Sequence, residues 1–330
     1  MTNMTASLIT NIFISSTTIT FTLFILTMFQ RRKDLLRKIP NRLLHSMVVC
    51  ELLKGLMLLC HISIELFDGT FNQTDCHWCI VFAILVDVVT SFLTKVFVLH
   101  LCVMVFERRL AVTRALFFEM IFTGRFVKKM LVLIWIIPAV VSFIQFAYLY
   151  PYLLWIPEQM DSAWIALFEI VYALVAFIVF TVIPSIGISV AYFHILAEIR
   201  RIQEKQKKLR LDLRMQIRPY SNSKNNNNNM SSMKQPRLKK SHVASLNVKP
   251  QSKAAICLFL IFICFIGFSL PYFLLRLYVD FMIWLEKEIT LAPLVFNVVY
   301  TLKNLTSLVN AVIYIVMNRE VRKKTVSFLF

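Results

Sequence analysis

Seven long runs of apolar residues dominate the pattern of the 330-residue chain. Each run reaches about 20 residues or more, the length that a helix rising about 1.5 Å per residue needs to cross a hydrocarbon core about 30 Å thick. The runs are continuous, whereas a membrane barrel has short alternating strands. We therefore predict an all-α membrane protein, a bundle of seven transmembrane helices at Leu8–Phe29, Leu43–Phe67, Ile80–Phe106, Met130–Leu149, Trp164–Leu196, Ala254–Leu275 and Leu291–Met317.

Composition supports a membrane environment. Hydrophobic residues make up 58% of the chain and charged residues only 16%, whereas apolar residues are about half of an ordinary soluble protein. The first run lacks a basic leader and a cleavage site of the Ala-x-Ala type, so we expect it to be retained as a span. The predicted organisation is a short segment 1–7, the bundle 8–317 and a tail 318–330.

The net charge of +18 would suggest a nucleic-acid partner in a soluble protein, so the positions of the 36 Lys and Arg residues matter. Every second connection is basic, with six of these residues in Arg31–Arg42, six in Arg108–Lys129, fifteen in Arg200–Lys253 and four in Arg319–Lys324. The other connections hold only Arg276 and Lys287. Short basic loops stay cytoplasmic. We therefore predict a plasma-membrane protein with an extracellular N-terminus and a cytoplasmic C-terminus, whose basic loops contact anionic lipid and not nucleic acid.

The connection Ala197–Ser252 is the long one. Glu198–Ile217 keeps apolar residues at helical spacing, which predicts that the fifth helix continues into the cytosol. Beyond it, about 218–252, apolar periodicity is lost and we predict disorder. Prolines within spans are expected to kink their helices, at Pro138, Pro184, Pro271 and Pro293.

Two features mark the segments predicted to be extracellular. Asn3 and Asn72 begin Asn-x-Thr sequons and are predicted glycosylation sites. Cys76 and Cys79 flank His77 in a Cys-x-x-Cys spacing, which leaves open a zinc fragment, a redox pair, a local disulfide or two unpaired thiols. No second ligand cluster accompanies them, so we expect neither a metal nor a cofactor.

A carboxylate and a guanidinium stand together where the third span ends, at Glu107-Arg108. Such a pair can hold together at rest and separate when helices part, although a solvated cationic helix end is the alternative. The pair resembles the Asp/Glu-Arg-Tyr motif of rhodopsin-like G-protein-coupled receptors, with Arg109 in place of the tyrosine. Glu107–Ala111 with the later Phe118-Glu119 is also similar to nematode chemosensory serpentine receptors.

The same resemblance covers the fifth and seventh spans. Asn310 and Tyr314 match the family's Asn-Pro-x-x-Tyr signature, with Ala311 in place of proline. One helix face carries both side chains, where they can bridge neighbouring helices. Tyr192 follows Pro184 by eight residues as in the family, which implies that it meets Arg108 in the active state. The resemblance also implies a short cytoplasmic eighth helix in 318–330.

Three further spans carry matches. Phe265, Pro271 and Tyr272 follow the family's sixth-span pattern, with Ser269 where the family has tryptophan. Glu51 stands for the sodium-binding aspartate of the second span, where Asn41 and Ser46 also match, and Trp135 is the tryptophan of the fourth. The first span lacks the family's asparagine, and the loop before Trp164 lacks the cysteine that usually bridges to the third helix.

Ionised side chains inside a bilayer cost about 2.5–3.5 kcal/mol, so those present are expected to face the bundle interior. They are Glu51, Lys54, Asp87, Lys95, Glu169 and Lys303. We expect Glu51 to face Ser307 and Asn310 and to hold a proton or a cation, or to pair with Lys54 or Lys303.

Polar residues on one face of the third span predict a ligand pocket with residues of the sixth and seventh spans. The predicted set is Asp87, Thr90, Ser91, Lys95, Ser269, Tyr272, Tyr300 and Lys303. The alternative is that this face only fixes helix packing. Family amine receptors carry an acid where this chain has Thr90, and opsins carry their retinal lysine one residue beyond Lys303, so neither an amine nor retinal is favoured.

Together these patterns predict a G-protein-coupled receptor that transmits an extracellular ligand signal to a heterotrimeric G protein. The predicted relay is Glu107, Arg108, Tyr192, Asn310 and Tyr314. A transporter or channel that uses Glu51, Lys54, Lys95 and Lys303 is the alternative. Catalysis is not expected, because the six histidines form no metal-ligand pair or acid–histidine cluster within one span.

Overall fold

The computed structural model describes residues 2–31, 39–68, 77–113, 115–155, 162–222, 248–285, 287–288 and 291–317. Within these residues every regular element is helical. The helices are α1 (Thr2–Arg31), α3 (Ile39–Asp68), α4 (His77–Thr113), α5 (Ala115–Ile121), α6 (Gly124–Trp155), α7 (Ser162–Phe177), the π-helix η2 (Ile178–Val182), α8 (Ile183–Asn222), α9 (Val248–Trp284) and α10 (Pro293–Met317). Over these ranges seven helical stretches are long and apolar enough to cross a membrane, with α7, η2 and α8 forming one of them. The predicted fold is confirmed.

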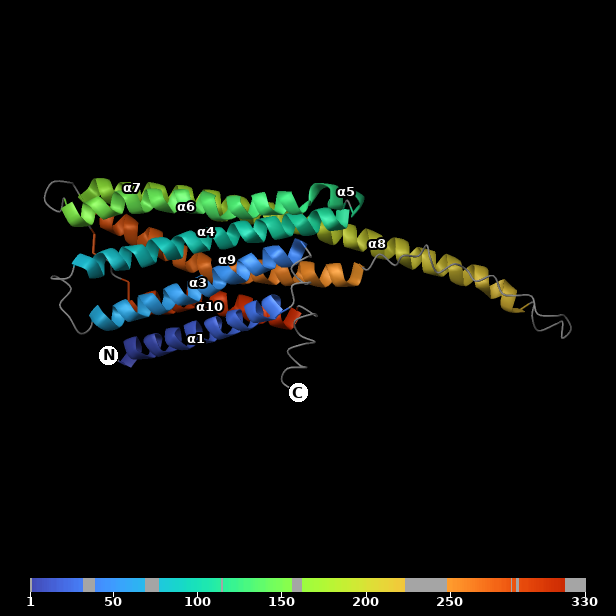
Figure 1. The fold of residues 1–330 in the computed structure, drawn as a ribbon, viewed down its shortest axis with the longest axis horizontal. Helices are drawn as coiled ribbons and strands as arrows, with labels where there is room; N and C mark the ends of the chain where they lie inside the picture. The colour runs from blue at the N-terminus through green and yellow to red at the C-terminus, as the bar shows by residue number, and fades with distance from the viewer. Residues whose placement is uncertain are drawn as a thin grey trace.

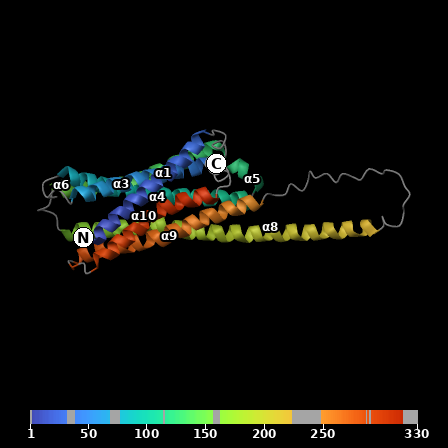
Figure 2. The ribbon, with the colours of Figure 1, turned by 90° about the horizontal axis from the view of Figure 1, so that it is seen from below.

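The long helices lie side by side, and successive ones run in opposite directions (Figure 1). α8 extends far beyond the others (Figure 2), and we call the end of the bundle from which it projects the α8 end. α4 runs through the middle of the bundle and packs against α3, α6, α8 and α9.

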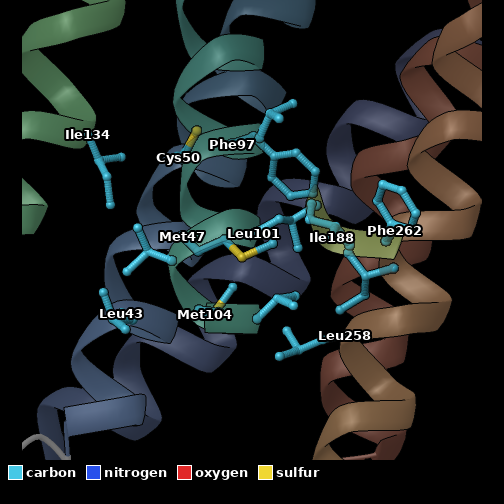
Figure 3. Close-up of a cluster of buried hydrophobic side chains, with 14 of the residues drawn as sticks. Leu43, Met47, Cys50, Phe97, Leu101, Met104, Ile134, Ile188, Leu258 and Phe262 are labelled. Atoms are coloured by element: carbon cyan, nitrogen blue, oxygen red, sulfur yellow. The ribbon is translucent and has the colours of Figure 1, made fainter. Parts of the chain in front are cut away.

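Apolar side chains from several helices meet in the core around α4 (Figure 3). Phe97 and Leu101 of α4 are fully buried, as are Leu43 and Met47 of α3. Ile188 of α8 belongs to the same cluster, as do residues of α1, α6, α9 and α10. Because the lipid-facing sides of a membrane bundle are also apolar, hydrophobicity alone does not mark this interior; close packing does.

Proline positions account for two features of the helices. Pro184 has no N–H to donate to the preceding turn. The π-helix η2 ends two residues before it, closed by the Ile183 N–H donating to the Ile178 carbonyl. Pro271 lies inside α9, and the kink expected there stays a prediction. The predicted kink at Pro293 is wrong, because this residue is the first of α10, where the missing N–H has no intrahelical partner.

Glycine brings α1 and α3 close together. A Cβ atom at Gly55 would lie 3.0 Å from Cγ1 of Ile19. At the same contact the Ser15 hydroxyl donates to the Gly55 carbonyl at 2.8 Å. Small residues permit this kind of close helix approach in membranes.

The helices extend beyond the apolar runs. The expected continuation of the fifth span is confirmed, because α8 reaches Asn222. α9 begins at Val248, so the segment predicted to be disordered, 218–252, is helical at both of its ends. The short helix α5 was not predicted.

Several predictions fall outside the described residues. They concern residues 223–247, the eighth helix in 318–330, Asn72 and Cys76. The side chains of Asn3 and Cys79 also lie outside the described part, so the glycosylation sites and the cysteine pair stay predictions.

Candidate functional site

A cavity of about 230 Å³ lies inside the bundle, toward the end opposite the α8 end. α3, α4, α7, α9 and α10 supply most of its walls. The structure brings all the predicted pocket residues to this one cavity, namely Asp87, Thr90, Ser91, Lys95, Ser269, Tyr272, Tyr300 and Lys303. Ser269, where the family has a bulky tryptophan, contributes only a small side chain to the wall. The part that these residues play in ligand binding stays a prediction.

Charged side chains form one wall of the cavity, which we call the acidic rim: Asp87, Glu169, Arg276 and Asp280. Arg276 Nη1 lies 3.3 Å from Asp87 Oδ2, and Arg276 Nε lies 3.5 Å from Asp280 Oδ1. The sequence-based placement of Arg276 in a connection is wrong, because α9 continues to Trp284. The i, i+4 spacing of Arg276 and Asp280 was the signal that a helix continues there.

Two lysines of the cavity wall, Lys95 and Lys303, form no ion pair with a carboxylate of the described residues. Lys95 Nζ donates to Ser91 Oγ at 2.8 Å, Ser142 Oγ at 3.2 Å and Tyr172 Oη at 3.4 Å. Lys303 Nζ lies 3.7 Å from the ring centroid of Tyr272 and 5.7 Å from that of Tyr300. The lysine ammonium groups are therefore held by hydroxyls in one case and by aromatic faces in the other.

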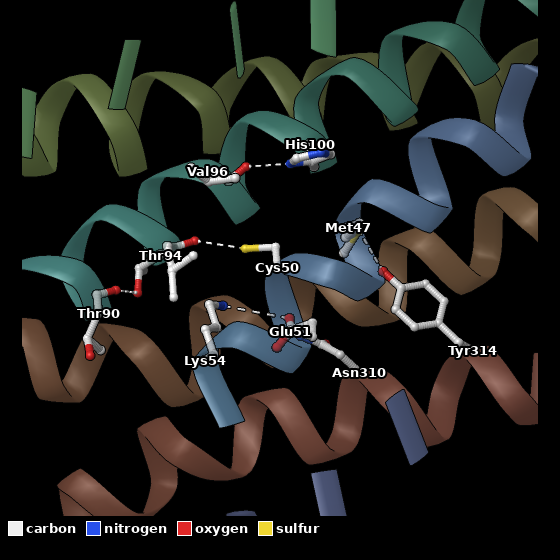
Figure 4. A network of polar contacts seen from close by, with 11 residues as sticks. Met47, Cys50, Glu51, Lys54, Thr90, Thr94, Val96, His100, Asn310 and Tyr314 are labelled. Atoms are coloured by element: carbon white, nitrogen blue, oxygen red, sulfur yellow. Dashed lines mark hydrogen bonds and ion pairs between the residues drawn. The ribbon is translucent and has the colours of Figure 1, made fainter. Parts of the chain in front are cut away.

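Glu51 forms a buried polar cluster between α3 and α10 (Figure 4). Asn310 Nδ2 donates to Glu51 Oε1 at 2.9 Å, and Lys54 Nζ lies 3.6 Å from the same oxygen. Of the two lysines considered, Lys54 is therefore the partner, and Lys303 contacts the tyrosines instead. Ser307 lines the cavity, but no bond from it to Glu51 is found in the described part of the chain.

Four of the predicted relay residues gather toward the α8 end, namely Glu107, Arg108, Tyr192 and Tyr314, whereas Asn310 lies in the Glu51 cluster. Arg108 Nε lies 3.3 Å from Glu107 Oε2, and Glu107 is only 2% exposed. The Tyr314 hydroxyl donates to Met47 Sδ at 2.7 Å (Figure 4). The Tyr192 hydroxyl is buried and has no hydrogen-bond partner among the described residues. In this state the arginine and the two tyrosines are not bonded to one another.

One polar cluster was not predicted from the sequence, because no role was given there to His100. Trp135 Nε1 donates to Ser46 Oγ at 3.1 Å, and His100 Nε2 lies 2.9 Å from the same oxygen. His100 Nδ1 lies 2.9 Å from the Val96 carbonyl, which only accepts. In a neutral ring Nδ1 is therefore the donor and Nε2 accepts the Ser46 proton. The cluster ties α3, α4 and α6 together.

We found no cluster of three His, Cys, Asp or Glu side chains suited to a metal ion within the described ranges.

Comparison with known proteins supports the receptor resemblance. The family model described as 7 transmembrane receptor (rhodopsin family) matches residues 21–314, a range that includes the cavity, the Glu51 cluster and the relay. A search of curated proteins finds no match to the chain. The family match does not favour the transporter or channel alternative, and the nematode resemblance stays a prediction. The chain belongs to the rhodopsin family of seven-transmembrane receptors.

Proposed function

We propose that this receptor lies in the plasma membrane, binds an extracellular ligand in the cavity and activates a heterotrimeric G protein at the α8 end. The observation that carries the proposal is the course of α4. Lys95 lines the cavity, and Arg108 on the same helix belongs to the Glu107–Arg108 pair. The two residues are separated by about 20 Å along the helix axis, so one element reaches both the ligand site and the coupling site.

Charge distribution supports the proposed orientation. Arg42, Arg125 and Lys128 lie together at one surface hollow, and the extension of α8 is strongly basic. Because basic segments resist translocation, this end faces the cytosol and can contact anionic lipid. The sequons at Asn3 and Asn72 then face outward, where glycosylation takes place.

The described conformation supports a resting state. Glu107 holds Arg108, and Met47 accepts the Tyr314 hydroxyl. Within the bundle, Phe97 of α4 contacts Phe265 of α9 with ring centroids 5.4 Å apart. Activation moves α8 and α9 outward, separates this contact and lets Arg108 leave Glu107.

The Tyr192 hydroxyl gains hydrogen bonds in the active state that it lacks in the resting state. Its buried hydroxyl has no hydrogen-bond partner in the described residues, and an unsatisfied buried donor costs about 1–3 kcal/mol. In the active state this hydroxyl meets Arg108 and Tyr314. An agonist drives the change only to the extent that it binds the open state more tightly than the closed one.

Nucleotide exchange on purified G proteins tests the proposal. We expect receptor in nanodiscs to accelerate exchange on at least one Gα subtype, and Arg108→Ala to abolish this acceleration at equal receptor amount. Arg109→Ala is the matched control, because it removes the same charge from the next position of α4 and should retain most of the activity. Equal activity of the wild type and Arg108→Ala would remove the assignment of the relay.

A further inference from the structure

Two of the three lysines that line the cavity, Lys95 and Lys303, form no ion pair within the described ranges. Lys95 is 6% exposed, and its ammonium donates to three neutral hydroxyls. The Lys303 ammonium lies near the rings of Tyr272 and Tyr300. Among the residues that the structure describes, no carboxylate lies within ion-pair distance of either ammonium, and no acceptor takes a hydrogen bond from Lys303.

The other cations of the cavity are compensated. Lys54 has Glu51, and Arg276 has both Asp87 and Asp280. Burial of an uncompensated charge is costly because water has been removed without a counter-charge to replace it. Lys95 is buried and Lys303 is half-buried, so the two lysines leave the cavity with uncompensated positive charge, which a bound anion would neutralise.

Charge is also polarised along the cavity. The acidic rim holds three carboxylates against one guanidinium, Arg276. Lys95 lies eight residues beyond Asp87 on α4, about 12 Å further from the rim end. Lys303 lies against Tyr272, which is one helical turn deeper than Arg276 on α9. The inner part of the cavity is thus positive and the rim negative.

We infer that the ligand is a small organic acid with a single carboxylate, which is bound at the inner end of the cavity by Lys303 and Lys95. This inference rests on the proposed function, since it takes the cavity to be the receptor's ligand site. Lys303 supplies donors that have no acceptor in the described residues, and Lys95 supplies a second positive charge. Charge-assisted hydrogen bonds of this kind are the strong ones.

Orientation and selectivity follow from the polarity of the cavity. The body of the acid points toward the rim and lies along the rings of Tyr272 and Tyr300. A second carboxylate at the far end would be repelled by Asp87, Glu169 and Asp280, whereas an amine there would be tolerated. We therefore expect monocarboxylates to bind better than dicarboxylates of the same length, and amines without an acid group not to bind.

Matched probes test this without knowledge of the natural ligand. The thermal midpoint Tm of purified receptor in nanodiscs is measured with hexanoate, hexanamide, hexylamine and adipate, and with phenylpropionate, phenylpropionamide and phenylpropylamine. Sodium chloride at equal ionic strength is the inorganic control. A ligand that binds only the folded state raises Tm as its concentration exceeds Kd. We expect at least one monocarboxylate to raise Tm, with little effect of its amide, its amine, adipate or chloride.

Variants locate the binding site. Lys303→Met should weaken binding of the active monocarboxylate about tenfold or more, because a charge-assisted bond is lost. Lys303→Arg should retain much of the binding. Lys287→Met is the matched control, because it removes an exposed lysine that does not line the cavity, and it should leave binding unchanged. If Lys303→Met does not fold, binding to Lys95→Met and the probe series on the wild type still decide whether the lysines bind a monocarboxylate.

Each other result overturns the inference. Absence of a Tm shift with every acid would exclude a carboxylate site, and equal shifts with amides or amines would exclude charge recognition. Equal protection by chloride would show an inorganic anion site only. The receptor proposal is tested separately by exchange in Arg108→Ala: intact Arg108-dependent coupling with no acid binding would refute the acid ligand alone, whereas acid binding without coupling would refute the G-protein proposal alone.

Discussion

Replacing Lys54 with methionine removes the cation beside Glu51 while keeping a side chain of similar length against Phe97. Glu51 is 1% exposed and Lys54 12% exposed, with 3.6 Å between Nζ and Oε1. Loss of one partner from a buried ion pair costs about 3–5 kcal/mol, because the remaining charge is left without compensation. The Asn310 amide still donates to Glu51 at 2.9 Å. We therefore expect the lower end of this range, about 3 kcal/mol.

A thermal assay with a thiol-reactive dye can measure this loss. Cys50, next to Glu51, is completely buried and becomes reactive only when the bundle opens. A loss of about 3 kcal/mol corresponds to a fall in Tm of roughly 6 °C, at about 2 °C per kcal/mol for a large domain.

The double variant provides the control. Glu51→Gln combined with Lys54→Met removes both charges and keeps an oxygen acceptor for Asn310, so its stability should return to within about 1 kcal/mol of the wild type. Unchanged Tm in the single variant, or equal losses in the single and double variants, would refute the idea that these two charges compensate each other.

Three further predictions concern packing, polar contacts and activation. Gly55→Val should lower Tm, because even a Cβ at this position lies 3.0 Å from Ile19, whereas the control Gly187→Val has open space around it and should not; equal losses would contradict the close approach of α1 and α3. Ser46→Ala should lower the free energy of unfolding by about 1–3 kcal/mol, because buried His100 and half-buried Trp135 lose the hydroxyl that they share. Ser189→Ala, at an exposed serine, is the control, and thermal unfolding measures both variants. Tyr192→Phe should keep or raise Tm while reducing nucleotide exchange, since its hydroxyl bonds nothing in the described resting contacts; full exchange activity in this variant would remove Tyr192 from the relay.

The fold was predictable because bilayer length and continuous hydrophobicity leave little choice of element. Helix ends were less predictable, since charged residues such as Arg276 and Asp280 end an apolar run without ending the helix. The π-helix before Pro184 follows from the missing proline donor, but its exact residues depend on packing against neighbouring helices.

The cavity was predictable to the extent that buried charge in a membrane has to face the interior. Helical spacing alone placed Asp87 and Lys95 on one face, and span order set Lys303 opposite them. Pairing was not predictable, because Glu51 had two lysines within plausible reach and only the three-dimensional register selects Lys54. His100 was missed for the same reason: its partner Ser46 lies 54 residues away in the chain.

The orientation of the chain in the membrane is the claim on which the receptor account depends most directly. An epitope inserted between Ser221 and Met230, just past the basic extension of α8, tests it in whole cells, with an epitope placed after Met1 as the matched control. The account predicts that antibody labels the N-terminal epitope on intact cells and the inserted epitope only after permeabilisation. Labelling of the inserted epitope on intact cells would contradict it.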